Sequence, residues 1–177
     1  MYGHAELQAD ARGYGLVLYV AQGSTGTVPH PQFSPYASTF LHGLYAFVRT
    51  HRPITVYRAF GHDPTASARM LARFWSPARP SLAIDRLGYA SAHNRLREQQ
   101  SVLRRWNPLS EVVEAELAAG TEIFLGRTGK QESGGERYAG GDIQFFLNTR
   151  DQNGDFIDGL PEVSYQLQLK RRHGTGA

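Results

Sequence analysis

A Gly-rich loop that runs directly into a short apolar segment is the feature that most constrains how this chain can fold. The loop spans residues 134–141, and the aromatic and β-branched segment spans residues 143–147. Such a segment predicts a strand, and Gly140-Gly141 permit a backbone path that other residues adopt with difficulty. One amide, Gln144, interrupts the apolar segment. A polar group at this place either satisfies a local hydrogen-bond network or is directed at a ligand.

Length and composition limit the class of protein. The 177 residues suffice for one domain with a substantial core, and we assign residues 1–177 to a single domain. The absence of cysteine excludes disulfides, thiolate catalysis and Cys-based zinc sites. A net charge of +3 favours anionic partners such as nucleotides but is too small to indicate nucleic-acid binding. No apolar segment is long enough to predict a membrane-spanning helix.

The first half of the chain has the patterns of both helices and strands. Ser34-Pro35 is typical of a helix start, and apolar residues then recur at helical spacing. Asp63-Pro64 has the same character. We therefore predict strands at residues 16–21 and 54–60, and helices at residues 35–50, 64–74 and 90–106.

The second half has mostly strand patterns. Residues 111–117 fit a helix or a strand, and the following turn favours a strand that leads into a second one at 121–126. Residues 163–169 alternate strictly between apolar and polar types, which predicts a long-looped hairpin with the Gln144 strand. We expect residues 1–13 and 170–177 to be flexible. Helices early and strands late indicate an α+β fold.

Several residues are candidates for a functional site, each with a structural alternative. Arg58 interrupts an apolar strand, where it either binds a phosphate or carboxylate or lies at a solvent-exposed edge. Phe74 and Trp75 either stack on a flat heterocycle, to which Ser76 forms a hydrogen bond, or pack in the core under a turn. Gln144 is a poor general base, but its amide both donates and accepts hydrogen bonds.

The charged loop residues have weaker signals. Arg79 and Arg86 either hold a diphosphate or lie in solvent, and Glu132 and Glu136 are the carboxylates that a transferase would use. The seven histidines are scattered without a metal-binding spacing. The acidic residues at 151–158 resemble fragments of a calcium loop, but the position of Gly154 and the missing distal Glu break the EF-hand pattern and favour a turn. We therefore expect no metal site.

The order of these motifs resembles the ADP-ribosyltransferase superfamily. A strand that ends in Val56-Tyr57-Arg58 precedes a Phe-Trp-Ser-Pro segment at 74–77, and a Gly-Thr-x-Ile-x-x-Gly strand at 120–126 precedes Gly-Gly-Asp-Ile-Gln-Phe at 140–145. The similarity is greatest to bacterial toxin domains that hydrolyse NAD, typified by the tuberculosis necrotizing toxin family. Phe145 stands where that branch usually has tyrosine.

The resemblance implies a fold and a set of roles. It implies a split β-sheet core with peripheral helices. Arg58 would contact the NAD phosphates, together with Arg86 or, as the second choice, Arg79. Ser76 would border the nicotinamide pocket, and Phe74 and Trp75 would enclose the nicotinamide ring. Gln144 would hydrogen-bond the ribose hydroxyls.

The resemblance also implies an activity, NAD hydrolysis to nicotinamide and ADP-ribose, with NAD as substrate and no metal. A neutral amide cannot deprotonate a macromolecular acceptor, which favours water as the nucleophile. Two alternatives remain: a mono-ADP-ribosyltransferase of protein or RNA that uses Glu132 or Glu136, and a catalytically silent binding module. Only the transferase alternative involves nucleic acid, and none involves a membrane.

A toxin domain of this kind would be the C-terminal piece of a larger secreted effector that is delivered into a host cell or, in competition between bacteria, into a competitor cell. It would act in the cytoplasm of a target cell. A cognate immunity protein would restrain it.

Overall fold

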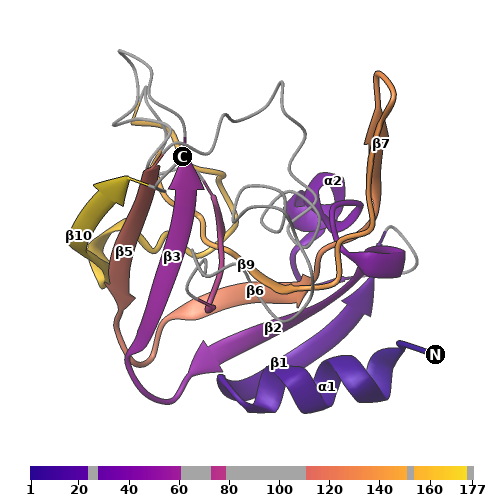
Figure 1. Ribbon diagram of the computed structural model, residues 1–177. Coiled ribbons are helices and arrows are strands. Elements are labelled where there is room, and N and C mark those ends of the chain that lie inside the picture. The colour runs from indigo at the N-terminus through magenta and orange to yellow at the C-terminus, as the bar shows by residue number, and fades with distance from the viewer. Residues whose placement is uncertain (24–27, 61–72, 79–110, 151–153, 175–177) are drawn as a thin grey trace.

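The computed structural model of the chain describes residues 1–23, 28–60, 73–78, 111–150 and 154–174. Two α-helices, three 3₁₀ helices and ten strands are assigned there (Figure 1). The helices are α1 (His4–Arg12), η1 (Pro31–Phe33), α2 (Ser34–Ala37), η2 (Leu41–Gly43) and η3 (Ser164–Gln166). The strands are β1 (Gly15–Gln22), β2 (Leu44–Thr50), β3 (Ile54–Phe60), β4 (Phe74–Trp75), β5 (Glu111–Leu117), β6 (Glu122–Arg127), β7 (Gln131–Ser133), β8 (Glu136–Tyr138), β9 (Ile143–Phe146) and β10 (Leu167–Gly174).

Two antiparallel sheets meet at β4. The larger sheet has the order β1-β2-β6-β9-β4, and the smaller has the order β10-β5-β3. Trp75 of β4 pairs with Phe145 of β9, and the next residue, Ser76, forms a bridge with Tyr57 of β3. Two backbone bonds of 2.8 Å close that bridge, from Tyr57 N to Ser76 O and from Ser76 N to Tyr57 O. The sheets are thus joined edge to edge.

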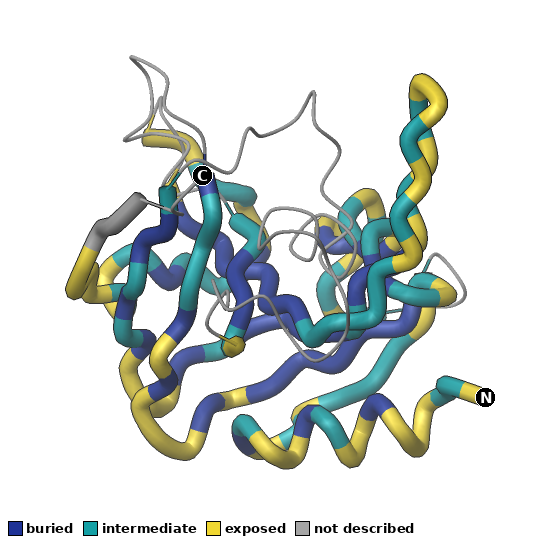
Figure 2. Tube along the Cα trace, in the orientation of Figure 1, coloured by how far each residue is buried: buried dark blue, intermediate teal, exposed yellow. Residues whose placement is uncertain are grey.

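The central strands of the larger sheet bury both of their faces. On one face, which we call the inter-sheet core, β2, β6 and β9 pack against α1 and the smaller sheet. On the other face, which we call the aromatic core, the same strands pack against η1, α2 and residues 157–160. The buried members of the aromatic core are Phe33, Ala37, Phe40, Tyr45, Phe47, Phe124, Phe146 and Leu160. Figure 2 shows the buried strands at the centre and exposed residues along the outer side of α1.

The helix predicted at residues 35–50 is wrong. Helix α2 ends at Ala37, and His42 and Gly43 have φ angles of 57° and 67°, which interrupt a right-handed helix. Residues 44–50 form β2, which is paired with β1 on one side and with β6 on the other. Leu44, Ala46 and Val48 lie in the inter-sheet core, whereas Tyr45 and Phe47 lie in the aromatic core. A strand buried on both faces is apolar throughout and has no period of two.

Both ends of the chain are more ordered than expected. Residues 4–12 form α1, which buries Leu7 and Ala11, spaced one helical turn apart, so the expected flexibility of 1–13 is wrong there. Residues 167–174 form β10, which pairs with β5, so the tail expected from residue 170 is wrong as far as Gly174.

The predicted hairpin between the Gln144 strand and residues 163–169 is also wrong. Strand β9 lies between β6 and β4, and residues 164–166 form η3 before β10 begins. The Gly-rich segment at residues 134–141, expected to be a loop, forms the turn and the second strand of a hairpin, β7–β8, which projects from the body of the molecule (Figure 1). Positive φ angles at Gly134 and Gly135 form its turn.

The remaining strands confirm the sequence patterns. Strands β1, β3, β5, β6 and β9 form where strands were predicted, and β5 resolves the choice between helix and strand at 111–117. The arrangement is a sheet-rich α+β fold. Most of the predicted helix at 64–74, and all of that at 90–106, lie outside the described residues, whereas Phe74 is in β4.

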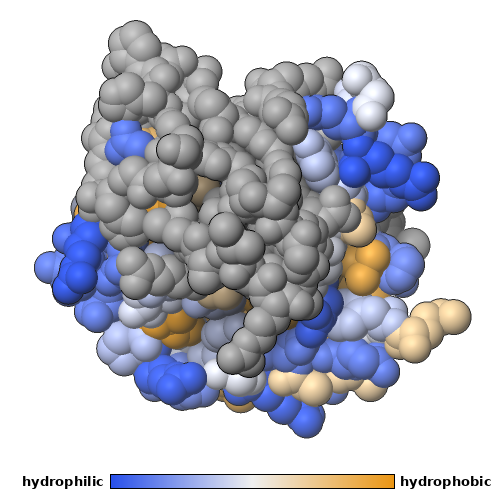
Figure 3. Space-filling view, viewed as in Figure 1, coloured by the Kyte–Doolittle hydropathy of each residue, from blue (hydrophilic) through white to orange (hydrophobic). Residues whose placement is uncertain are grey.

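The described surface is largely polar on the face shown in Figure 3, where hydrophobic residues are scattered among hydrophilic ones. Scattered exposed apolar residues are normal for a folded protein. Within the described part of the chain, no helix has the length and apolar character needed to cross a membrane.

Candidate functional site

Strand β4 brings the main candidate residues onto neighbouring strands. Phe74 and Trp75 pair with Phe146 and Phe145, and this register, continued by one residue, sets Ser76 beside Gln144 of β9. On its other side Ser76 pairs with Tyr57, the residue before Arg58. Arg58, Ser76 and Gln144 therefore lie on three adjacent backbone segments where the two sheets join. They are far apart in sequence.

Arg58 faces inward on β3. It shares its face of the strand with Ile54, Val56 and Phe60, all of which are in the inter-sheet core. Its Nη1 donates a 2.6 Å hydrogen bond to the carbonyl oxygen of Phe74. Burial of the guanidinium lowers the pKa of Arg58 to about 10, which still leaves it protonated at neutral pH. The alternative of a solvent-facing edge arginine does not describe this side chain.

Gln144 is a buried polar residue, with 8% of its surface exposed. It is on the same face of β9 as Phe146, a member of the aromatic core, and opposite to Phe145, a member of the inter-sheet core. Its partner on β6 is Gly126. A Cβ atom at Gly126 would lie 2.7 Å from Leu44 O and 2.8 Å from Phe40 Cδ1, so only glycine lets the Phe40 ring pack against β6 at the position that pairs with Gln144.

The two aromatic residues of β4 do not face each other. Trp75 is 1% exposed in the inter-sheet core, whereas Phe74 contacts Phe146 in the aromatic core, with ring centroids 5.4 Å apart. Adjacent residues of a strand point to opposite faces. The expectation that Phe74 and Trp75 together enclose one ring is therefore corrected. Trp75 is a core residue.

Ser76 is engaged in a local turn. Its hydroxyl donates to Ala78 O over 3.0 Å and accepts from Ala78 N over 3.1 Å. Both bonds fix the direction in which the chain leaves β4. The candidate loop arginines, Arg79 and Arg86, lie outside the described residues.

The two candidate carboxylates are on the projecting hairpin. Glu132 of β7 forms a 2.6 Å ion pair with Lys130, which lowers the pKa of the carboxylate, and its side chain is 59% exposed. Glu136 is on the opposite strand, β8, where it pairs with Ser133. An exposed carboxylate with a lowered pKa is a weak base, so the geometry of Glu132 does not favour catalysis.

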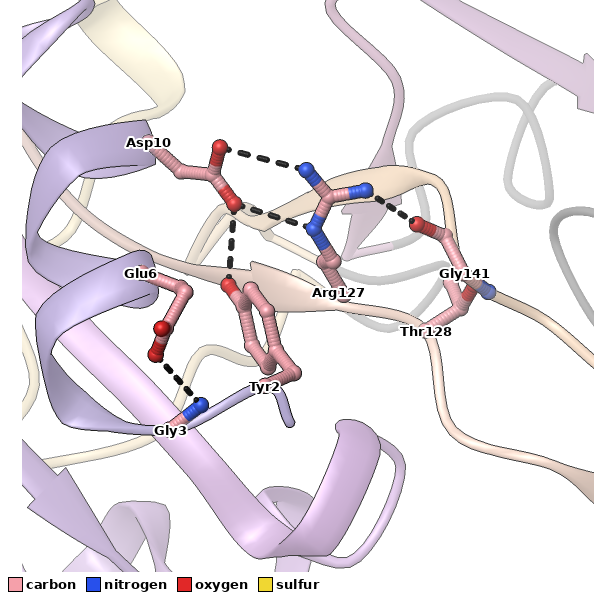
Figure 4. A network of polar contacts seen from close by, with 7 residues as sticks. All are labelled: Tyr2, Gly3, Glu6, Asp10, Arg127, Thr128 and Gly141. Carbon is pink, nitrogen blue, oxygen red and sulfur yellow. Dashed lines mark hydrogen bonds and ion pairs between the residues drawn. The ribbon is translucent and has the colours of Figure 1, made fainter.

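A polar network that joins α1 to the end of β6 and the start of β9 was not expected from the sequence. Tyr2 and Asp10 of the N-terminal segment contact Arg127 at the end of β6, and Arg127 contacts Gly141, just before β9 (Figure 4). The one available signal was the spacing of Leu7 and Ala11, which predicts a helix face for residues that otherwise look unpatterned. Within the described residues no group of three or more His, Asp or Glu side chains could hold a metal ion.

Comparisons with known proteins give one solved structure. No protein-family model matches the chain, and no curated protein matches it significantly. A chain of the solved structure of Tne2 in complex with Tni2 aligns with a TM-score of 0.49 and 21% identity, covering 76% of this chain and 96% of that one. A score and identity at this level do not establish a shared fold.

Proposed function

We propose that this chain is an NAD glycohydrolase domain with an ADP-ribosyltransferase-like core. The observation that supports it most is the meeting of the two sheets at β4, where the strands of Arg58 and Gln144 become neighbours. A split sheet of this kind, with an inward arginine on one part and an amide on the other, is what the sequence resemblance implies. The roles below are proposals that follow from it.

Arg58 would bind the pyrophosphate of NAD. Its guanidinium is a permanent cation in a desolvated setting, where attraction for an anion exceeds that at an exposed site. The hydrogen bond from Nη1 to Phe74 O fixes the orientation of the guanidinium. Arg86 would be the second phosphate contact, with Arg79 as the alternative.

Gln144 would hold the ribose while the bond to nicotinamide breaks. Cleavage of the C1′–N bond develops positive charge on the ribose ring, and a water oxygen then bonds to C1′ while its proton is released. Nicotinamide leaves as a neutral molecule. An amide can donate to one ribose hydroxyl and accept from another, but it cannot remove a proton from a macromolecular acceptor. Water therefore fits this site better than a protein or RNA nucleophile does.

The positions of Ser76, Phe74 and Trp75 limit the roles that these residues can have in the proposed site. Ser76 would border the nicotinamide pocket through its backbone, because its hydroxyl is used in the turn to Ala78. Phe74 remains available as a ring beside the pocket, whereas Trp75 supports β4 from the core. A secreted effector that acts in the cytoplasm of a target cell, restrained by an immunity protein, would be the biological setting.

The product of the reaction tests this proposal. Purified protein is incubated with NAD labelled in the adenine ring, alone and with a cell extract, and free ADP-ribose is separated from labelled macromolecules. Free ADP-ribose in both samples supports hydrolysis. Label that appears only on macromolecules, and that Glu136→Gln abolishes while Gln144→Ala does not, would replace the hydrolase by a transferase. No turnover and no NAD binding by calorimetry would leave a binding module.

A further inference from the structure

The N-terminal helix is connected to the Gln144 strand through one arginine. Arg127 Nε donates to Asp10 Oδ2 over 2.9 Å, and Arg127 Nη2 donates to Asp10 Oδ1 over 3.2 Å. This is a two-bond arginine–carboxylate pair, the geometry that gives both strength and fixed orientation. It raises the pKa of Arg127, so the cation is maintained at any ordinary pH.

Tyr2 completes the helix side of this contact. Its hydroxyl donates to Asp10 Oδ2 over 3.0 Å, and its ring lies under the guanidinium, with Arg127 Cζ 5.2 Å from the ring centroid. Burial and the nearby Asp10 carboxylate raise the pKa of Tyr2. Glu6 accepts a 2.9 Å bond from Gly3 N and so fixes the first turn of α1 (Figure 4). Asp10 is thereby presented to β6 by a capped helix with a buried face.

The third side of the guanidinium holds the backbone that leads into β9. Arg127 Nη1 donates to Gly141 O over 3.0 Å. Next to it, Gly141 N donates to the Thr128 hydroxyl over 2.8 Å, and Thr128 N donates to Asp142 O over 2.8 Å. Three successive peptide groups, those of Gly141 N, Gly141 O and Asp142 O, are thus bound to Arg127 and Thr128 at the end of β6.

The segment before β9, Gly140-Gly141, would be conformationally free without these hydrogen bonds. Gly140 and Gly141 have φ angles of 75° and 114°, a region in which glycine has many accessible conformations. Gln144 lies three residues further along the chain, and its strand has the register Arg127↔Ile143 and Gly126↔Gln144. A shift of the Gly141 peptide would therefore displace the start of β9 and, with it, the side-chain amide of Gln144.

We propose that Asp10 and Arg127 are a positioning pair that sets the place of the Gln144 side chain, so that α1 is part of the active-site support. This inference rests on the proposed NAD glycohydrolase activity. The pair itself does not touch the substrate. It acts by holding Gly141, and through Gly141 the beginning of β9.

A matched control is available on the same strand. Arg49 of β2 donates to Glu122, at the opposite end of β6, with Nε and Nη2 distances to Oε1 of 3.2 and 2.7 Å. This pair also joins an arginine to a carboxylate and has comparable exposure, 51% and 28% for its two side chains against 38% and 24% for Arg127 and Asp10. It connects two strands that are already paired and lies at the end of β6 away from the residues that pair with Ile143 and Gln144.

The test compares Asp10→Asn, Arg127→Gln, Arg127→Lys and Glu122→Gln in the full chain. We expect the first two to lower kcat for nicotinamide release about 10- to 100-fold with little change in KM, since a displacement near 1 Å can have this effect. The double variant Asp10→Asn/Arg127→Gln should lose no more kcat than either single variant, because both changes break the same contact. Arg127→Lys should not restore kcat, because an ammonium keeps the charge but cannot bridge Asp10 and Gly141. Glu122→Gln should leave kcat unchanged.

A second readout does not depend on activity. Hydrogen exchange of the peptide that covers residues 139–147 should be faster in Arg127→Gln than in the wild type, and unchanged in Glu122→Gln. Unchanged kcat and unchanged exchange in Asp10→Asn and Arg127→Gln would overturn the inference. So would an equal loss of kcat in Glu122→Gln. If the wild type releases no nicotinamide, the proposed function fails, and exchange alone then decides whether this pair fixes the Gln144 segment.

Discussion

The two faces of the five-stranded sheet are packed in different ways. The inter-sheet core is covered by regular elements, α1 and the hydrogen-bonded strands of the smaller sheet. The aromatic core is covered by η1, α2 and residues 157–160, which are short and irregular. There, rings supply the contacts: Phe33 is stacked on Phe124 at 4.1 Å and lies edge-on to Tyr45 at 4.6 Å.

This difference shows what each face requires. Regular elements satisfy their own backbone groups and need apolar side chains of any suitable shape. Short segments have few such bonds, so they are retained by large rings and by a few side-chain bonds to the backbone. Asn148 is one of these: its amide nitrogen donates to Ile157 O and Leu160 O, and its oxygen accepts from Ile157 N. Gln144 lies beside this second kind of packing.

The largest expected effect comes from removing the ring at the centre of the aromatic core. Phe33→Ala should reduce the free energy of unfolding by about 3–5 kcal/mol, because Phe33 is fully buried and contacts the rings of Phe40, Tyr45, Phe124 and Phe146. Urea unfolding measures it. Leu16→Ala is the control: Leu16 is 61% exposed, so the change should stay within about 0.5 kcal/mol. Equal effects would contradict the packing described.

A pair of adjacent residues compares the two faces directly. Phe145 and Phe146 are both fully buried, but Phe145 contacts one ring, Tyr14 at 4.9 Å, whereas Phe146 contacts Phe33, Tyr36, Phe74 and Phe124. Phe146→Leu should therefore be more destabilising than Phe145→Leu, by about 1–2 kcal/mol, since each aromatic pair adds to simple burial. Equal losses in urea unfolding would show that ring geometry contributes little.

A buried hydroxyl gives a smaller test. Tyr45 is fully buried in the aromatic core, and its Oη has no hydrogen-bond partner within the described structure. Burial raises the pKa of Tyr45. Tyr45→Phe removes an unpaired polar atom and keeps the ring, so the free energy of unfolding should be unchanged or rise by up to about 1 kcal/mol. A loss of stability would mean that the hydroxyl has a partner in solution.

The smallest expected effect is a pH dependence of the free energy of unfolding that comes from one histidine beside the aromatic core. The His30 ring lies 4.5 Å from that of Phe47 in a tilted arrangement and stacks on Tyr19, with which it shares a 2.7 Å hydrogen bond. Burial lowers the pKa of its imidazole from 6.5. The unfolded chain then binds the proton more readily, so this contribution to stability is complete above pH 6.5 and declines as the pH falls below it. Urea unfolding from pH 8 to 5 should show a shallower decline for His30→Gln. An identical decline would exclude this residue as the cause.

The sequence predicts the inter-sheet strands better than the aromatic side. Strands β3 and β6 are runs rich in β-branched and apolar residues, and such runs are reliable signals, whereas the sequence of β5 also fits a helix and only the turn that follows it favours a strand. The segment from Tyr36 to Val48 is apolar at helical spacing by coincidence, because β2 is buried on both faces while Phe40 lies in a separate turn. Periodicity cannot separate these cases.

For the candidate site, the sequence singles out Arg58 and Gln144 because each is a polar residue within an apolar strand. The strands of these two residues come together only through β4, a two-residue strand whose pairing has no signal in the local sequence. Asp10 and Arg127 are separated by 117 positions, and neither interrupts a pattern. Such a pair is visible only once the fold is known, because its members are ordinary surface types taken one at a time.

The release of nicotinamide from NAD by the purified wild-type chain and by Gln144→Ala, with no other macromolecule present, tests the central proposal most directly. The proposal predicts turnover by the wild type and a loss of kcat/KM of about 100-fold or more in the variant, as for the removal of a group that acts in the transition state. Circular dichroism and the unfolding midpoint establish that the variant is folded. Equal turnover by a folded Gln144→Ala protein would contradict the proposed role of Gln144, and no turnover by the wild type would contradict the proposed activity.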